Sequence, residues 1–193
     1  MPHSLPRPKA GDIVTIGEER IRVIHDEEQI AARVLELARE VAASEPRDLL
    51  VVPVLKGSFI FAADLLRAFY RVGLLTEVDF MILASYGAGT TSSGQVRVLR
   101  DIETEVRDRD VLVVEDILET GRTLAAARDL LRARGARRAM TAVLLDKKVP
   151  RAANVEADFA GFTCPDVFVV GYGMDKAHAY RELPFIGEIL PAE

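Results

Sequence analysis

The stretch VLVVEDILETGRTLAAARDLLRARG, residues 111–135, has the pattern of a buried strand that leads into a helix. Residues 111–114 are continuously apolar, which is typical of a strand covered on both faces within a parallel sheet. Two adjacent carboxylates, Glu115 and Asp116, follow this run. A helix is predicted over residues 123–134, with Gly135 as the residue that ends it. This succession of strand, polar loop and helix indicates an α/β domain.

The rest of the chain repeats the alternation of short strands and amphipathic helices. Two more helices are predicted, one that starts after Asp26 and ends before Pro46, and one over 59–70. Pro53 is unusual because proline lacks the N–H that a central strand normally donates. The other predicted elements are strands over 13–16, 21–24, 49–55, 78–86, 95–102 and 139–145, with one or two more within 159–171.

The predicted fold class is α/β, with a mostly parallel central sheet flanked by helices. The first two strands and roughly the last thirty residues are expected to form a small accessory hood lobe. Residues 1–10 contain three prolines and are predicted to be a flexible tail. Residues 11–193 are predicted to be a single domain, because no internal repeat or long linker interrupts them.

The composition excludes several classes of protein. Thirty acidic against twenty-five basic residues give a net charge of −5, which argues against a general nucleic-acid binder. The N-terminal residues lack the apolar core of a signal peptide, and no apolar run is long enough to span a membrane. The single cysteine, Cys164, favours a reducing compartment and is expected to serve packing. We therefore expect a cytoplasmic protein with no membrane partner.

The segment after the strand over 111–114 carries a possible binding site. The carboxyl ends of strands face the ligand crevice in an open α/β sheet, which is where Glu115 and Asp116 fall. The following loop leads directly into a helix, whose free N–H groups suit a phosphate. This pairing of carboxylates with an anion cradle favours a phosphorylated-sugar site over solvated charges and a simple helix cap. The loop consists of Glu119, Thr120, Gly121, Arg122 and Thr123.

The segment VVEDILETGRT resembles the phosphoribosyl-diphosphate signature of type I phosphoribosyltransferases. Three further segments resemble the hypoxanthine-guanine phosphoribosyltransferases of that family. They are VLKGSFIFAADL at 54–65, Ser85-Tyr86 before a glycine-rich stretch, and LLDKK at 144–148 followed by PDVFVVGYGMD at 165–175 and Arg181. The resemblance implies Mg²⁺-dependent transfer of the 5-phosphoribosyl group from phosphoribosyl diphosphate to N9 of hypoxanthine or guanine. The products would be IMP or GMP and diphosphate, and the enzyme would be a homodimer or homotetramer.

The resemblance also implies roles for the donor side of the site. Glu115 and Asp116 would hold the ribose hydroxyls and help to place Mg²⁺, which prefers oxygen ligands. The loop from Glu119 to Thr123 would bind the 5′-phosphate through backbone amides and hydroxyls, with no role assigned to the side chain of Arg122. Lys56 and Gly57 would bind diphosphate, with a non-proline cis peptide bond before Lys56.

On the acceptor side, the resemblance assigns Lys147 to the purine O6 and Phe168 to stacking on the ring. The carbonyls of Val169 and Asp175 would accept from the 2-amino group of guanine. The Asp175 carboxylate would bind a second Mg²⁺, and Arg181 would contact diphosphate. From the residues alone, Lys147 and Lys148 could equally be a solvated pair, Phe168 a core residue and Arg181 a surface residue.

Two further features complete the prediction. Residues 87–94 lack apolar anchors and are expected to be a mobile flap that Ser85 and Tyr86 open. Glu119 stands where the family usually has an aspartate that handles the purine N7 proton. Glutamate keeps the carboxylate but is one methylene longer, so we expect it to retain this acid/base role with a small shift of the purine or the loop.

Two alternatives remain open at this point. A xanthine-preferring relative would differ at the pocket edge near Asp175. A regulatory protein on the same fold would bind the nucleotide as an effector and nucleic acid as its target. The acidic net charge, Lys147, Arg181 and the expected flap argue against the regulator.

Overall fold

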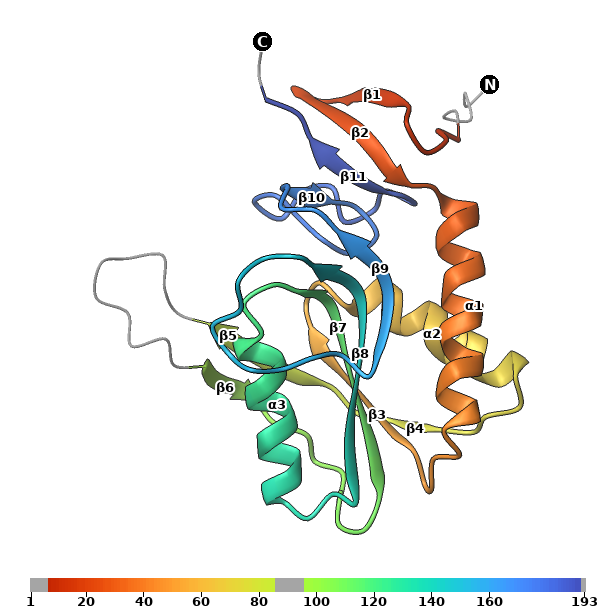
Figure 1. Cartoon of the computed structure of the whole chain (residues 1–193), viewed down its shortest axis with the longest axis vertical. Coiled ribbons are helices and arrows are strands. Elements are labelled where there is room, and N and C mark those ends of the chain that lie inside the picture. The colour runs from red at the N-terminus through yellow and green to blue at the C-terminus, as the bar shows by residue number, and fades with distance from the viewer. Residues whose placement is uncertain (1–6, 86–95, 192–193) are drawn as a thin grey trace.

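The computed structural model describes residues 7–85 and 96–191, and it contains two sheets and three helices over that part of the chain (Figure 1). The central sheet has the strand order β6-β5-β3-β7-β8-β9, with β4 paired to β3. Its strands are β3 (Leu50–Leu55), β4 (Glu77–Val78), β5 (Met81–Ser85), β6 (Val96–Arg100), β7 (Asp110–Leu118), β8 (Arg138–Lys147) and β9 (Phe159–Cys164). All pairs are parallel except β5 with β6. The predicted fold class is confirmed.

The helices are α1 (Glu27–Ala43), α2 (Phe59–Arg71) and α3 (Arg122–Ala133). Helices α1 and α2 cover one face of the central sheet and α3 covers the other (Figure 1). Successive residues of β7 alternate between the two cores: Leu112 and Val114 pack with α1 and α2, whereas Val111 and Val113 pack with α3. This alternation explains why the strand reads as a continuous apolar run.

Helix α1 begins where the sequence predicts. The Asp26 side chain accepts from the Gln29 N–H, and the Gln29 side chain accepts from the Asp26 N–H, which completes a capping box. The apolar residues that recur every three or four positions along α1 are all buried, namely Ile30, Val34, Leu37, Ala38 and Val41.

The predicted strand over 78–86 is interrupted at Asp79 and Phe80, which separate β4 from β5, although both strands pair in parallel with β3. At this interruption the carboxylate of Asp79 accepts from the backbone N–H groups of Phe80, Glu103 and Thr104. Pro53 lies in β3 beside this interruption. On the edge of β3 that pairs with β4 and β5, the N–H of Asp79 donates to the Val51 carbonyl. Pairing on this edge resumes with Val54 opposite Met81 of β5. The donor that proline lacks therefore falls where regular pairing is broken.

The smaller sheet has the order β1-β2-β11-β10 and is antiparallel throughout. Its strands are β1 (Ile13–Ile16), β2 (Glu19–His25), β10 (Val169–Val170) and β11 (Ile186–Ile189). It combines the first strands with the end of the chain and lies beyond the carboxyl ends of β8 and β9 (Figure 1). Its own core contains Ile21, Val23, Val170, Leu183 and Phe185.

Two remaining predictions concern the ends and the exterior of the chain. Residues 1–6 of the expected tail lie outside the described residues, while Lys9 and Ala10 donate backbone hydrogen bonds to Asp12 and Asp26. Among the described residues, the structure contains no helix of the length and apolar character that a membrane crossing requires.

Candidate functional site

The two adjacent acids lie inside a strand rather than after it, contrary to the predicted strand end at residue 114. Strand β7 continues to Leu118 because its pairing with β8 extends to the register Leu118 with Asp146. The pKa of Glu115 is held well above its usual range, mainly because the carboxyl group is buried and to a lesser extent because the charge of Asp116 is close by. Burial also raises the pKa of Asp116, although nearby Arg181 opposes this. The buried pair is therefore short of positive charge, which suits a cation or hydroxyl donors.

Gly57 and Asp116 lie in direct contact. A Cβ atom at Gly57 would lie 1.7 Å from Oδ2 of Asp116, so only glycine fits there. A Cβ atom at Gly173 would in turn lie 2.2 Å from the Gly57 carbonyl oxygen. The Leu55–Lys56 peptide bond is cis, as the sequence resemblance implied. The loop with Lys56, the β7 carboxylates and the loop with Gly173 therefore meet at one place.

The loop between β7 and α3 forms the expected helix entrance. Gly121 precedes the first residue of α3 and has a φ of +76°, a left-handed conformation that favours glycine. A Cβ atom there would also lie 2.6 Å from Val155. Because glycine has no side chain to accept from the first turn of the helix, the amides near Thr120, Arg122 and Thr123 suit an anion.

Lys147 lies at the carboxyl end of β8, and its side chain turns toward Glu119. Its Nζ lies 3.0 Å from Glu119 Oε1 and 3.0 Å from Asp166 Oδ1. The neighbouring Lys148 instead pairs with Asp146, 2.5 Å away. Burial lowers the pKa of Lys147, but the hydrogen bonds that its ammonium donates to the two carboxylates more than offset this, so that its pKa is raised. The structure thus distinguishes the two lysines that the sequence left equivalent.

A cavity of about 180 Å³ lies beside Lys147. It brings together predicted residues from four separate segments. Phe168, whose surface is 56% exposed, lines it, so this ring is not part of the core. The lining residues are Asp116, Ile117, Glu119, Lys147, Val167, Phe168, Val169, Met174 and Asp175.

Asp175 and Arg181 form an ion pair within the loop before β11. Arg181 Nη2 lies 2.7 Å from Asp175 Oδ1, and Arg181 Nη1 donates to the Gly173 carbonyl at 2.5 Å. The second Asp175 oxygen accepts from the His178 N–H at 2.7 Å. The Asp175 carboxylate therefore already has protein partners, which a metal would have to share or replace.

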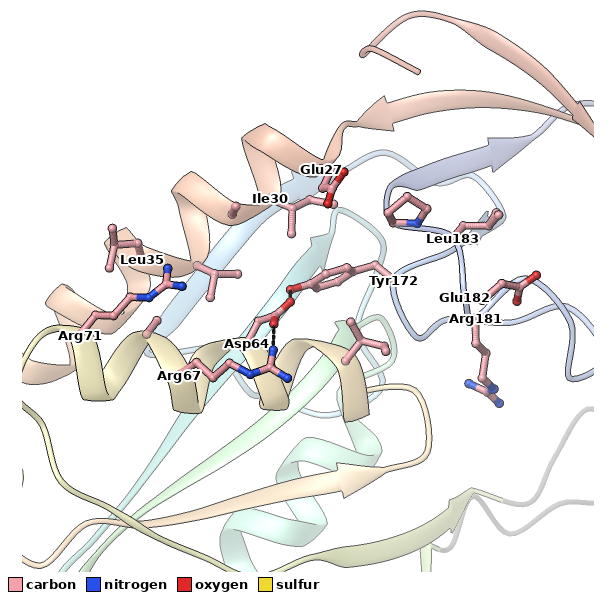
Figure 2. A pocket seen from close by; sticks show the side chains of 15 residues that line it. Glu27, Ile30, Leu35, Asp64, Arg67, Arg71, Tyr172, Arg181, Glu182 and Leu183 are labelled. Carbon is pink, nitrogen blue, oxygen red and sulfur yellow. Dashed lines mark hydrogen bonds and ion pairs between the residues drawn. The ribbon is translucent and has the colours of Figure 1, made fainter. Parts of the chain in front are cut away.

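A second, larger hollow of about 380 Å³ lies between α1, α2 and the 172–184 loop (Figure 2). The Tyr172 hydroxyl donates to Asp64 Oδ2 at 2.7 Å, and Arg67 lies 2.5 Å from the other Asp64 oxygen. Figure 2 shows Tyr172 reaching from the loop toward α2, with Arg181 on the same loop. The loop that carries Arg181 is thus tied to α2, the helix that follows Lys56 and Gly57.

Two predictions lie partly or wholly beyond what the structure describes. Ser85 is the last residue of β5, but Tyr86 and the expected flap over 87–94 lie outside the described residues. Over the described residues, no group of three or more histidine, cysteine or acidic side chains is placed to hold a metal ion. Mg²⁺ commonly uses only one or two protein carboxylates together with substrate phosphates, so Glu115 and Asp116 remain suitable.

Residues 21–177 match the family model described as phosphoribosyl transferase domain. The chain belongs to the phosphoribosyltransferase family. This phosphoribosyltransferase is 44% identical to the hypoxanthine-guanine phosphoribosyltransferase of Bacillus subtilis, over 89% of its own length and 94% of the relative's. It superposes on a hypoxanthine phosphoribosyltransferase from Staphylococcus aureus with a TM-score of 0.82 and 39% identity, covering 88% and 91% of the two chains.

Some relatives are much longer than this phosphoribosyltransferase. It is 46% identical to the bifunctional protein TilS/HprT of Listeria monocytogenes over 88% of its own length, but spans only 26% of that protein. Sequence reasoning missed two residues that the structure places at or near the site, Asp166 and Tyr172. Both lie in the segment 165–175 that carries the resemblance, but no role was predicted for them, because each meets its partner only through the fold.

Proposed function

We propose that this phosphoribosyltransferase transfers the 5-phosphoribosyl group from phosphoribosyl diphosphate to N9 of hypoxanthine or guanine, releasing diphosphate. The observation that carries the proposal is the buried Lys147 ammonium, which faces Glu119 at a cavity that Asp116 and Phe168 also line. The residues proposed to bind the acceptor and those proposed to bind the ribose phosphate thus line the same cavity. The hypoxanthine phosphoribosyltransferase names of the relatives support the same acceptor.

The donor side holds the sugar and its phosphates. Glu115 and Asp116 accept from the ribose hydroxyls, and the loop from Glu119 to Thr123 binds the 5′-phosphate with its amides. Diphosphate lies against Lys56, Gly57 and Arg181, where cationic and backbone donors stabilise the leaving group's charge. The contact between Gly57 and Gly173 supports this assignment, because it joins the two segments that carry Lys56 and Arg181.

The acceptor side positions the base. Lys147 donates to the purine O6, and Phe168 stacks on the ring. The carbonyls of Val169 and Asp175 accept from the 2-amino group when the base is guanine. A 6-oxopurine is favoured over adenine because an ammonium donates and cannot accept from a 6-amino group.

Glu119 acts as the base for the purine proton. As N9 forms its bond to C1′ of the ribose and the C1′–diphosphate bond breaks, the carboxylate accepts the proton from N7. Its side chain is 48% exposed, so the longer glutamate has room to turn from Lys147 toward the base. Transfer of the proton leaves a neutral purine in the nucleotide product.

Mg²⁺ is the proposed cofactor, and the residues fit it. The raised pKa values of Glu115 and Asp116 indicate buried carboxylates that a divalent cation would stabilise as anions. When bound, the ion would balance the charge of the diphosphate that leaves. To hold a second Mg²⁺, Asp175 would have to share its carboxylate with Arg181 and the His178 N–H or lose these partners.

The remaining proposals concern organisation. We propose that residues 11–193 act as one domain, with a hood formed by the smaller sheet, and that the chain is a homodimer or homotetramer. Light scattering would give the mass in solution. The cytoplasmic location stays a prediction.

An acceptor assay tests the proposal. Nucleotide formation is measured with hypoxanthine, guanine, xanthine and adenine, each with phosphoribosyl diphosphate and Mg²⁺. We expect hypoxanthine and guanine to react and adenine to be inert. Preferred use of xanthine would correct the acceptor, and no nucleotide from any base would refute the proposed function.

A further inference from the structure

Lys147 has two carboxylate partners, and only one of them has a place in the proposed reaction. Glu119 and Asp166 each lie 3.0 Å from its Nζ. The Lys147 side chain is 10% exposed, whereas that of Asp166 is 71% exposed. A buried cation is therefore paired with an exposed acid, which precedes Val167 in the wall of the cavity.

The backbone fixes Asp166 near Lys147. Strands β8 and β9 pair in parallel, with Lys147 opposite Cys164, and the N–H of Lys148 donates to the Cys164 carbonyl at 3.0 Å. The chain then turns, since the N–H of Val167 donates to the Pro165 carbonyl at 2.9 Å. Asp166 is thus anchored by the sheet and immediately precedes the segment that brings Phe168 to the cavity.

The geometry accounts for all three donors of the ammonium. A lysine ammonium has three N–H groups and no acceptor. Glu119 and Asp166 take two of them, which leaves one for a ligand in the cavity. Without Asp166, Glu119 would be the only carboxylate of the described residues that pairs with the buried Lys147 ammonium, and its movement toward a base would leave that charge without this partner.

We propose that Asp166 is a positioning residue, which holds the Lys147 ammonium toward O6 of the purine and keeps Glu119 free to leave Lys147 for N7. This inference rests on the proposed function. It adds a residue that touches neither the substrate nor the reacting atoms, and acts through Lys147.

The surroundings of Lys147 give the sign of the pH effect. Among the residues that the structure describes, Glu119, Asp166 and the thiol of Cys164 interact with Lys147, and Asp116 and Asp175 line the same cavity. Asp146 and Lys148 pair with one another instead. Because Asp166 raises the pKa of Lys147, its removal lowers that pKa. Lys147 must be protonated to donate, so purine binding would be lost at a lower pH in a variant without this carboxylate.

The test compares Asp166→Asn and Asp166→Glu with Glu156→Gln, an exposed acid on the connection between β8 and β9. For Asp166→Asn we expect the KM for hypoxanthine to rise about 3- to 10-fold and the KM for phosphoribosyl diphosphate to change less than about 2-fold. The alkaline limb of the pH profile of kcat/KM for hypoxanthine should move to lower pH. Asp166→Glu should restore much of the loss, and Glu156→Gln should match the wild type.

Three results would overturn the inference: an unchanged KM for hypoxanthine, an equal rise in both KM values, or an unmoved alkaline limb. Asp166 is exposed, so the variant should fold, and thermal unfolding checks this. If the wild type forms no nucleotide, the proposed function fails separately. The Lys147 side-chain pKa, measured by ¹⁵N NMR of the lysine Nζ, then decides, because Asp166→Asn must lower it and an unchanged value contradicts the inference.

Discussion

The Tyr172 hydroxyl donates a 2.7 Å hydrogen bond to Asp64, a residue 108 positions away on α2. Tyr172 has a φ of +49° and lies between two glycines that also have positive φ. The N–H of Tyr172 donates to the Leu183 carbonyl, and that of Gly173 to the Arg181 carbonyl. Tyr172 therefore connects the loop that carries Arg181 with the helix that follows Lys56 (Figure 2).

The first prediction concerns the variant Tyr172→Phe, which lacks the hydroxyl that donates to Asp64. The ring stays in place, while Asp64 keeps Arg67 as a partner, so the free energy of unfolding should fall by about 1 kcal/mol. The KM for phosphoribosyl diphosphate should rise a few-fold, and that for hypoxanthine should change little. Urea unfolding and steady-state kinetics measure these values. An effect on the purine alone would show that Tyr172 does not support the diphosphate side.

The second prediction concerns the contact between Gly57 and Asp116. Gly57→Ala would place a methyl group 1.7 Å from the carboxylate, so Asp116 must move. We expect kcat/KM for phosphoribosyl diphosphate to fall by about 100-fold or more, because misplacement of about 1 Å can cost this much. Gly73→Ala is the control: it has a positive φ but no atom within 4 Å of the added carbon. Its cost should be about 1 kcal/mol of stability without loss of activity.

The third prediction tests the acid/base role of Glu119. Glu119→Gln keeps the size but cannot accept the purine proton, so kcat should fall about 10²- to 10⁴-fold. The affinity for phosphoribosyl diphosphate, measured by calorimetry, should change far less. Glu119→Asp, which has the residue usual in the family, should retain activity. An unchanged kcat in the glutamine variant would remove Glu119 from the mechanism.

The fourth prediction concerns pH and stability away from the site. Asp110 is fully buried at the start of β7; burial alone would raise its pKa, but Arg138, the Arg47 N–H and Arg137 together lower it. A carboxyl with a lowered pKa in the folded state contributes stability above its unfolded pKa of about 3.9, and this is lost as pH falls through the folded value. Asp110→Asn should therefore cost about 3 kcal/mol at pH 7.

The same variant provides its own check. The difference in unfolding free energy between wild type and Asp110→Asn should shrink as the pH is lowered below about 4. A difference that stays constant down to pH 2 would mean that the charge of Asp110 does not contribute. Activity per folded molecule should be unaffected, because Asp110 lies at the opposite end of β7 from Glu119.

The sequence predicted elements whose pattern is local. The start of α1 after Asp26 and its buried face depend on residues three or four positions apart, and both are found as predicted, whereas the reciprocal bond from Gln29 was not predicted. The break at Asp79 was missed because it depends on amides of Glu103 and Thr104, which belong to a distant loop. The predicted strand end at residue 114 was wrong, because β7 continues past Glu115 and Asp116 while it pairs with β8.

The candidate site likewise contains residues that are close in the sequence and residues that only the fold brings together. Glu115, Asp116 and the 119–123 loop form one continuous motif, so their proximity follows from the sequence. Which of Lys147 and Lys148 faces the cavity depends on the alternation of β8, and Asp166 depends on the register between β8 and β9. Such relations across strands carry no signal in a single sequence.

The proposed function is tested most directly by the product that the purified chain forms from hypoxanthine and phosphoribosyl diphosphate with Mg²⁺. We expect IMP linked through N9, identified by NMR, with one diphosphate released per nucleotide. Hydrolysis of phosphoribosyl diphosphate without nucleotide, or no turnover of hypoxanthine at all, would contradict it.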